Sequence, residues 1–169
     1  MPPPILTTSR LRLRAFCPGD WDPYAAMMAD PELQRYVGGK VHSRDESWAS
    51  MAYFLGVWEL RGYGMFAVEH EGRFAGRVGI YHPPDWAEPE LGWTIAAPFW
   101  GQGLATEAAG RVRDWAFVTF GWDHLVSYIN PANTRSIRVA EKLGAAKGMD
   151  IELRGTTVLQ WVHQRPAAV

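Results

Sequence analysis

Apolar and polar residues alternate near the start of the chain, over residues 11–16. Leu11 and Leu13 share one face of this segment, and Arg12 and Arg14 share the other. Alternation with a period of two predicts a half-buried strand whose arginines face solvent. The first predicted element is therefore a strand.

Two segments with helical spacing follow this strand. Asp20 is the expected N-cap of a short helix, and the pair Asp30-Pro31 is expected to end it. Ser43 and Glu46 form a capping-box pattern, after which apolar residues recur at helical spacing. A second helix should therefore run from this box to about residue 61.

The rest of the chain alternates between strand and helix patterns. A hairpin is expected where Glu71-Gly72 separates two apolar runs. The further predicted elements are strands over residues 90–96, 125–129 and 156–163, one near residue 151, and helices over residues 104–120 and 134–143. Strand–helix–strand crossovers imply parallel neighbours and hairpins imply antiparallel ones, so we expect a mixed sheet of the α+β or α/β class.

Length and composition suit a single domain that spans residues 1–169. A chain of 169 residues with 47% hydrophobic and 21% charged residues falls in the globular range. No apolar run approaches the ~20 residues that a membrane helix needs, and the first residues lack a signal-peptide pattern. We therefore expect a cytoplasmic protein that does not associate with membranes.

Charge and cysteine content exclude several kinds of site. A net charge of −1 without a cluster of Lys and Arg disfavours general nucleic-acid binding. Cys17 is the only cysteine, which excludes an internal disulfide, and it is expected to be a buried structural residue. The five histidines lack the spacings that metal ligation favours, so no metal site is expected.

The most informative segment leads from a predicted strand through a glycine turn into a helix, and reads Gly101-Gln102-Gly103-Leu104-Ala105-Thr106. The first N–H groups of a helix lack intrahelical partners and carry the positive end of the dipole, and glycines let a pyrophosphate approach them closely. The same glycines could serve only a strand-to-helix turn. A Rossmann site would need a third glycine or alanine where Thr106 stands, and an acidic residue after the next strand, where Asn130-Pro131 stands. A Walker loop would need Gly-Lys-Ser/Thr, which the sequence lacks. Both kinds of site are therefore disfavoured.

Three motifs stand in order along nearly the whole chain: LTTSRLRLR over residues 6–14, ELGW over 90–93 with FWGQGLATEA over 99–108, and NPANTRSIRVAEKLG over 130–144. In this order they resemble the GNAT superfamily of acyl-CoA N-acyltransferases, in particular the RimJ/RimL-like branch of ribosomal-protein N-terminal acetyltransferases. The resemblance implies a single-domain fold with a mixed, largely antiparallel twisted sheet flanked by helices, whose splayed central parallel strands hold acyl-CoA. It also implies transfer of an acetyl group from acetyl-CoA to a primary amine.

The resemblance also assigns residues to acetyl-CoA. The pyrophosphate motif falls on Trp100 to Ala105, with Trp100 where the family has Gln or Arg. The backbone of Ile95 and Ala97 is expected to pair with the pantetheine arm like an added strand. Asn133 and Ser136 are expected at its thiol end and Arg138 near its phosphates. Residue chemistry alone instead predicts that Asn133 caps a helix, that Ser136 is an ordinary helix residue and that Arg138 is solvated. The full set is Ile95, Ala97, Trp100, Gly101, Gln102, Gly103, Leu104, Ala105, Thr106, Asn133, Ser136 and Arg138.

Acetyl transfer to an amine needs a base, a stabilised oxyanion and a proton for the leaving thiolate. Alkyl amines have a pKa near ~10, so a base must remove a proton directly or through water. We assign Glu90 as this base, because it begins the strand before the cofactor loop; its alternative role is that of a solvent-facing strand residue. The position where the family usually has a tyrosine as general acid is Ala140 in this chain. We therefore assign Ser136 as the group that supplies a proton to the leaving thiolate, with Tyr128 as the alternative.

The acceptor and two other functions stay open. Trp86, Tyr81 and Trp93 are expected to wall the acceptor cleft, and Asp85 and Glu88 to attract a cationic amine. A protein N-terminus and a small-molecule amine both fit, as do a monomer and a homodimer. Loss of the Tyr acid also fits an acyl-CoA-binding regulatory protein without efficient turnover, and the glycine turn alone fits a nucleotide-binding module.

Overall fold

The structure is a computed structural model that describes residues 2–167. The strands are β1 (Leu6–Thr7), β2 (Leu11–Arg14), β3 (Met65–His70), β4 (Arg73–Tyr81), β5 (Glu90–Ile95), β6 (His124–Ile129), β7 (Ala146–Leu153) and β8 (Thr156–Gln164). The helices are α1 (Trp21–Met28), α2 (Pro31–Val37), α3 (Arg44–Arg61), α4 (Leu104–Phe120) and α5 (Thr134–Lys142), with 3-10 turns η1 (Pro18–Asp20) and η2 (Ala97–Phe99).

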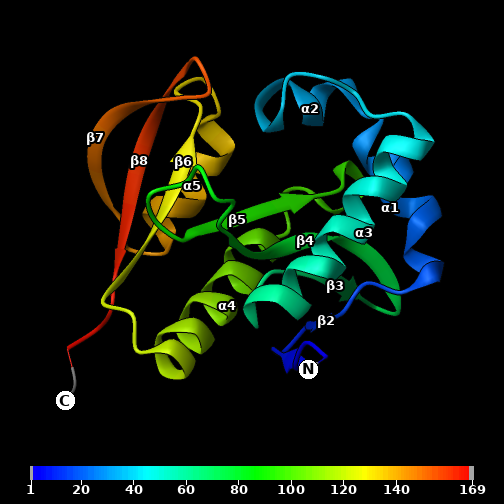
Figure 1. Cartoon of the computed structure of the whole chain (residues 1–169), viewed down its shortest axis with the longest axis horizontal. Coiled ribbons are helices and arrows are strands. Elements are labelled where there is room, and N and C mark those ends of the chain that lie inside the picture. The colour runs from blue at the N-terminus through cyan, green and yellow to red at the C-terminus, as the bar shows by residue number, and fades with distance from the viewer. Residues whose placement is uncertain (1, 168–169) are drawn as a thin grey trace.

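Within these residues the strands form one sheet in the order β1-β2-β3-β4-β5-β6-β8-β7 (Figure 1). Every neighbouring pair described is antiparallel except β5 and β6, which are parallel and are joined through α4. The expected mixed α+β fold with a largely antiparallel sheet is confirmed. No helix among residues 2–167 is both long and apolar enough to cross a membrane.

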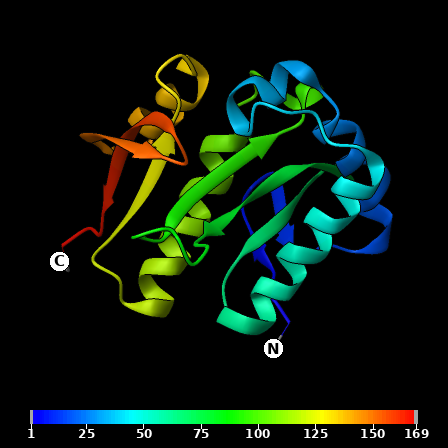
Figure 2. The ribbon, with the colours of Figure 1, turned by 45° about the horizontal axis from the view of Figure 1, so that its top comes forward.

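Helices α3 and α4 lie on opposite faces of the sheet (Figure 2). α4 packs on β4 and β5 through a stripe that includes Leu104, Ala108 and Val112, whose i, i+4 spacing puts them on one side of the helix. α3 buries Phe54 and Trp58. Because apolar stripes press on both faces, the central strands are buried and hold their side chains at fixed positions.

The predicted starts and stops of the longer elements are confirmed. Ser43 and Glu46 form the capping box that begins α3, and Gly62 ends that helix in a left-handed conformation. Glu71 and Gly72 both adopt positive φ in the two-residue turn between β3 and β4, as a tight hairpin requires. The strand expected near residue 151 is the eight-residue β7.

Helix α1 ends at Met28, just before Asp30-Pro31 as predicted, but the same pair also begins a helix that was not predicted, α2. The Asp30 carboxylate accepts hydrogen bonds from the N–H groups of Glu32 and Leu33, and Pro31 takes the first helical position. A proline is well placed there, because the N–H that it lacks would have no intrahelical partner. Helix α2 and the two-residue strand β1 are therefore elements that the sequence pattern missed.

Asp20 does not cap α1, which corrects the N-cap prediction. Its carboxylate accepts from the Arg14 guanidinium at 2.7 and 2.9 Å and from the Cys17 N–H, so no side-chain cap bond forms. Arg14 is consequently only 17% exposed, whereas its strand pattern predicted a solvent-facing side chain. Cys17, expected to be buried, is exposed.

Strands β5 and β6 separate soon after they meet. Their paired register consists of Glu90 opposite Val126, with the Val126 N–H donating to the Pro89 carbonyl. One residue further on, the Ser127 hydroxyl donates to the Leu91 carbonyl at 2.6 Å, where a backbone ladder would otherwise continue. The two central strands therefore splay apart from Glu90 onward.

Candidate active site

Two clefts of similar size meet where β5 and β6 diverge. The glycine cleft, about 540 Å³ in volume, lies over the start of α4 and is bounded by Ile95, Trp100, Gly101, Gly103 and residues of α5. The glutamate cleft, about 500 Å³, lies over β4 and β5 and is lined by Glu90. Both clefts share the lining residues Tyr36, Val37, Trp93, Thr94, Asn133 and Ser136. Ligands in the two clefts would therefore contact each other at this junction.

The glycine turn places the start of α4, with its backbone N–H groups, beside the glycine cleft. Gly101 and Gly103 have φ near +75° and +77°, a left-handed conformation that favours glycine, and Gly103 is the N-cap of α4 with no side-chain cap bond. Arg10 holds the turn from outside, donating to the Gln102 carbonyl at 2.9 Å while pairing with Glu107. The first N–H groups of α4 are left for an anion.

Ten of the twelve residues predicted to bind the cofactor line the glycine cleft: Ile95, Trp100, Gly101, Gly103, Leu104, Ala105, Thr106, Asn133, Ser136 and Arg138. The other two, Ala97 and Gln102, lie outside its lining. Ala97 belongs to turn η2, because β5 ends at Ile95, and its carbonyl accepts from the Trp100 N–H. Gln102 is exposed, with its carbonyl bound to Arg10.

The outer wall of the glycine cleft contains a pair that sequence reasoning missed. Arg135 on α5 forms an ion pair with Glu32 on α2 at 2.7 Å, and its guanidinium lies 4.1 Å from the centre of the Trp100 ring. The Trp100 indole in turn donates to the Ile95 carbonyl at 2.6 Å. No local pattern relates these residues, since α2 itself was not predicted.

Ser136 lies at the junction with both lone pairs of its hydroxyl oxygen in use. The Trp93 indole N–H donates to this oxygen at 3.2 Å and the Asn133 amide at 3.1 Å. Asn133 also caps α5, because its side-chain oxygen accepts from the Ser136 N–H. Among residues 2–167 the Ser136 hydroxyl donates to no acceptor, so its hydrogen is free to point into the junction.

Glu90 lies at the point where the strands part, partly buried at one end of the glutamate cleft. Its carboxylate accepts from the Trp86 indole N–H at 2.7 Å and from the Tyr128 N–H at 3.4 Å. Burial raises the pKa of Glu90 to about 7, against the opposing effect of the Trp86 hydrogen bond. A carboxylate with this pKa exchanges a proton near neutral pH, as a general base must.

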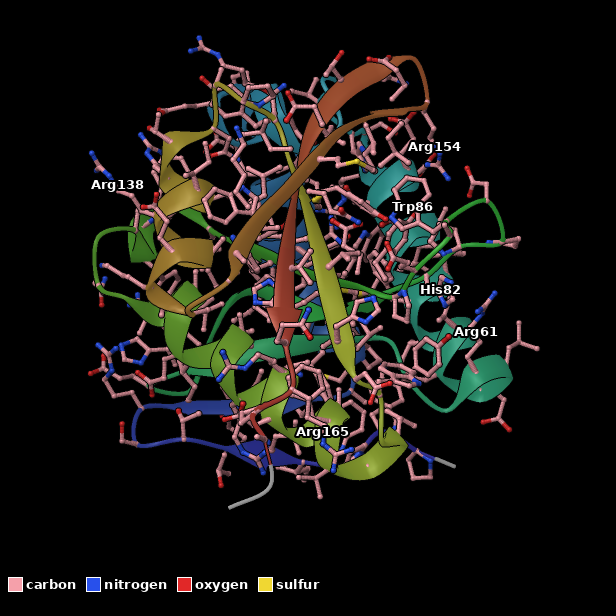
Figure 3. The ribbon with its side chains drawn as sticks, turned by 90° about the vertical axis from the view of Figure 1, so that its left-hand side faces the viewer. Arg61, His82, Trp86, Arg138, Arg154 and Arg165 are labelled. Carbon is pink, nitrogen blue, oxygen red and sulfur yellow. The ribbon has the colours of Figure 1, made fainter. Side chains whose placement is uncertain are left out.

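Trp86 organises the mouth of the glutamate cleft. Besides bonding Glu90, its ring packs edge-on against Tyr81 and Tyr128, and the Arg154 guanidinium lies 4.5 Å from its centre. Figure 3 shows Trp86 and Arg154 close together on one side of the molecule, with Arg138 pointing outward on the other. Tyr81, Trp86 and Trp93, which were expected to wall the acceptor cleft, all line the glutamate cleft.

The two acidic residues expected to attract an amine are already paired. Asp85 holds Arg154 through two hydrogen bonds of 3.0 Å, and Glu88 accepts from His124 and Gln160. Neither residue lines the glutamate cleft. That prediction finds no support, because these carboxylates are bound to cationic and amide groups of the chain itself.

His163 and Ser127 anchor β6 behind the site. Ser127 donates to the Leu91 carbonyl, so its oxygen accepts from the N–H at Nε2 of His163, 2.9 Å away. Burial lowers the pKa of His163 to about 4, which keeps the imidazole neutral. This pair fixes the splayed strand and supplies no exchangeable proton near neutral pH.

Comparison with known proteins agrees with this geometry. The family model described as "Acetyltransferase (GNAT) domain" matches residues 10–146. The uncharacterized protein YkkB of Bacillus subtilis (strain 168) is 33% identical over 154 residues, which cover 82% of this chain and 83% of YkkB. The match extends over most of the chain, including the glycine turn, Glu90 and Ser136.

Solved structures show the same fold. An acetyltransferase from Agrobacterium tumefaciens str. C58 is 33% identical, with a TM-score of 0.87 over 97% of this chain and 96% of that one. RimL, a ribosomal L7/L12 alpha-N-protein acetyltransferase in complex with coenzyme A, has a TM-score of 0.81 over 95% of this chain and 98% of its own, at 17% identity. At 17% identity, the likeness to RimL shows a shared fold. Because the family model matches residues 10–146, most of the chain, the chain belongs to the GNAT family of acetyltransferases.

Proposed function

We propose that this protein transfers the acetyl group of acetyl-CoA directly to a primary amine, with Glu90 as general base. The observation that carries the proposal is the junction of the two clefts, where the free hydroxyl hydrogen of Ser136 and the cleft of Glu90 meet. The acceptor is a small-molecule amine or a protein N-terminus. We propose that the protein acts in the cytoplasm.

The glycine cleft suits acetyl-CoA in shape and chemistry. The donors at the start of α4 match a pyrophosphate, and the left-handed glycines leave the approach to them open. Arg138 borders the same cleft and would add positive charge beside the phosphates, whereas Arg135 is already paired with Glu32. RimL, whose fold this chain shares, is known in complex with coenzyme A. Bound there, acetyl-CoA supplies an activated acetyl thioester.

Glu90 would hold the proton that the amine must lose. With a pKa of about 7, the carboxylate is substantially ionised at neutral pH and still basic enough to accept a proton. Because Glu90 lies several residues from the junction along β5, we propose that the proton reaches it through a chain of waters in the glutamate cleft. Tyr128, proposed as an alternative acid, borders the same cleft, and burial raises the pKa of its phenol.

Ser136 would donate its hydroxyl hydrogen to the departing sulfur. Two donors already occupy its oxygen, so the hydroxyl can act toward the cleft only as a donor. A hydrogen bond to a developing thiolate is charge-assisted and therefore strong. This arrangement offers a physical substitute for the tyrosine that Ala140 replaces.

Amine-dependent release of free thiol from acetyl-CoA tests the proposal. We expect thiol and acetylated amine to appear in equal amounts when the protein is mixed with acetyl-CoA and a panel of amines. Tight acetyl-CoA binding without thiol release from any amine, peptide N-termini included, would instead support an acyl-CoA-binding regulatory protein. Preferred binding of ATP or NAD would support the nucleotide-binding alternative.

A further inference from the structure

The glutamate cleft contains one guanidinium whose role the proposed reaction leaves unexplained. Arg77 lies on β4, directly across from Thr94 on β5, and both residues line the cleft. Thr94 also lines the glycine cleft, so Arg77 stands at the end of the glutamate cleft closest to the junction. Arg77 therefore extends from the part of β4 that lies opposite a residue shared by both clefts.

Arg77 has no hydrogen-bond or ion-pair partner among residues 2–167. Its Nε atom is buried and makes no hydrogen bond among residues 2–167, and no carboxylate of that part of the chain lies within ion-pair distance of it. The nearest defined contact is the Phe54 ring, whose centre lies 4.8 Å from the guanidinium carbon. A cation–π contact stabilises the charge but provides no acceptor for the N–H groups.

Arg154, the other arginine that lines this cleft, has a carboxylate partner. Asp85 accepts two hydrogen bonds from it in the bidentate geometry that guanidinium groups favour. Arg77 has the same capacity, but no carboxylate in the described part of the chain pairs with it. Glu90 is the carboxylate that lines the cleft, and it lies four residues before Thr94 on β5, roughly 13 Å along the strand. The positive charge of Arg77 opposes the rise in the pKa of Glu90, but the two side chains form no ion pair among residues 2–167. Glu90 is held there by Trp86.

The cleft offers an unused acceptor as well as this unused donor. Gln34 on α2 is only 2% exposed and lines the cleft. Its amide N–H group donates to the Met28 carbonyl, whereas its Oε1 atom has no partner among residues 2–167. Buried polar groups without partners are uncommon in native proteins, and an occupant with both an oxyanion and N–H or O–H donors would satisfy both.

We propose that the acceptor is an amine that also carries an oxyanion, a carboxylate or a phosphate, and that Arg77 binds this group. The inference rests on the proposed acetyltransferase function and narrows its acceptor class. Arg77 near the junction holds the oxyanion a few bonds from the amine and so directs the nitrogen toward the acetyl group. A cleft of about 500 Å³ has room for a small molecule of this kind.

Matched pairs of amines test this inference. The pairs are phenylalanine with 2-phenylethylamine and ornithine with putrescine, which differ by a carboxylate, and phosphoethanolamine with ethanolamine, which differ by a phosphate. We expect the wild-type protein to prefer the oxyanion-bearing member of at least one pair by roughly 10- to 100-fold in kcat/KM, expressed mainly in KM. The favoured pair identifies the oxyanion.

Variants of Arg77 separate a binding role from a structural one. Arg77→Gln should bring the selectivity ratio of the favoured pair close to one, and Arg77→Lys should retain part of it, because lysine keeps the charge but not the bidentate geometry. Arg73→Gln is the matched control, since Arg73 is an exposed arginine of the same strand outside both clefts. Melting temperature and acetyl-CoA affinity report whether each variant is folded.

The outcomes distinguish this inference from the proposed function. If wild type acetylates amines but shows no preference within any pair, or if Arg77→Gln keeps the wild-type ratio, Arg77 does not select the acceptor and only this inference is overturned. If no amine releases thiol from acetyl-CoA, the acetyltransferase proposal fails and the acceptor assignment fails with it.

Discussion

Ser136 is the residue whose hydrogen bonds most narrowly define its role. Because Trp93 and Asn133 both donate to its oxygen, replacement by alanine removes the one hydroxyl hydrogen directed to the junction. We expect Ser136→Ala to lower kcat by roughly 10- to 1000-fold, the range typical of one preorganised donor, while the Kd of acetyl-CoA changes little. Ser136→Thr keeps a hydroxyl and should recover part of kcat. Steady-state kinetics and acetyl-CoA titration measure both quantities, and an unchanged kcat in Ser136→Ala would leave Ser136 as a helix residue only.

Glu90 should reduce stability in the pH range where it functions. Its pKa is about 7 in the folded protein against 4.5 for an ordinary glutamate, so the folded state binds the proton more tightly than the unfolded state does. The stability gained from the protonated form is complete below pH 4.5 and is lost as the pH rises through 7, on the order of 3 kcal/mol at most.

Glu90→Gln resembles the protonated form at every pH. We therefore expect this variant to melt a few degrees above the wild type at pH 8 and at nearly the same temperature at pH 5. Thermal denaturation at the two pH values makes the comparison. If the difference in melting temperature between Glu90→Gln and wild type were the same at both pH values, burial of the ionised Glu90 carboxylate would not be what destabilises the wild type.

The contacts of single residues could be predicted where the interacting residues lie close together in sequence. Asn133 and Ser136 stand three residues apart at a helix start, and the structure joins them by the hydrogen bonds that this spacing allows. Asp85 lies in a loop, and its partner Arg154 is 69 residues away in sequence, so nothing local foretold that its charge would be neutralised. Arg77 gave no sequence signal, because its importance lies in the absence of a partner.

The glycine turn that begins α4 is the element on which cofactor binding should depend. Gly103→Asp places a side chain and a negative charge where the pyrophosphate is proposed to lie, in a left-handed conformation that Asp tolerates better than most residues. We expect acetyl-CoA binding to weaken by at least ~100-fold while the fold survives. Isothermal titration measures the affinity and circular dichroism the fold.

The opposite end of α4 provides a matched control for this substitution. Gly121 is also left-handed, with φ of +69°, and ends the same helix outside both clefts. Gly121→Asp therefore adds the same charge and similar backbone strain without touching the glycine cleft. If the two variants weaken acetyl-CoA binding equally, the effect is one of general stability and the pyrophosphate binds elsewhere.

Elements with strong local signals were predictable, and elements set by long-range pairing were not. The capping box of α3, the apolar stripe of α4 and the hairpin turn were read directly from residue spacing. Helix α2 was missed because Asp and Pro both end one helix and start another, and two residues cannot show a period in β1. The splay of β5 from β6 came from the family resemblance, since it depends on Ser127 reaching Leu91 across the sheet.

The molecule as a whole should become more stable when acetyl-CoA binds. A ligand that binds only the folded state adds RT ln(1 + [L]/Kd), or about 2.7 kcal/mol at a hundredfold excess over Kd. For a chain of this length that corresponds to a rise of roughly 5–10 °C in melting temperature. Differential scanning fluorimetry with acetyl-CoA and, separately, with ATP measures it. No shift at millimolar acetyl-CoA would contradict the assignment of the glycine cleft.

The site is assembled by parts of the chain that are distant in sequence. Helix α2, strands β4 and β5, and helix α5 all contribute to the clefts, and the ion pair between Glu32 and Arg135 joins elements 103 residues apart. Sequence reasoning supplied the motifs on β5, α4 and α5, where family resemblance and helix chemistry agree. It could not supply the contribution of α2, whose Tyr36 and Val37 line both clefts.

The pH dependence of acetyl transfer by Glu90→Gln tests most directly the claim that this molecule is an amine acetyltransferase with Glu90 as its base. With the preferred acceptor, wild-type kcat/KM referred to the total amine should rise with pH to a plateau, with a midpoint near 7 as Glu90 ionises. Glu90→Gln should lack this step and be slower by ~10²- to 10⁴-fold at neutral pH, with a defect that shrinks as the pH approaches the amine pKa. Glu88→Gln, altered outside both clefts, should follow the wild-type profile. If Glu90→Gln kept the kcat/KM of the wild type across this pH range, Glu90 would not be the base and the account would be contradicted.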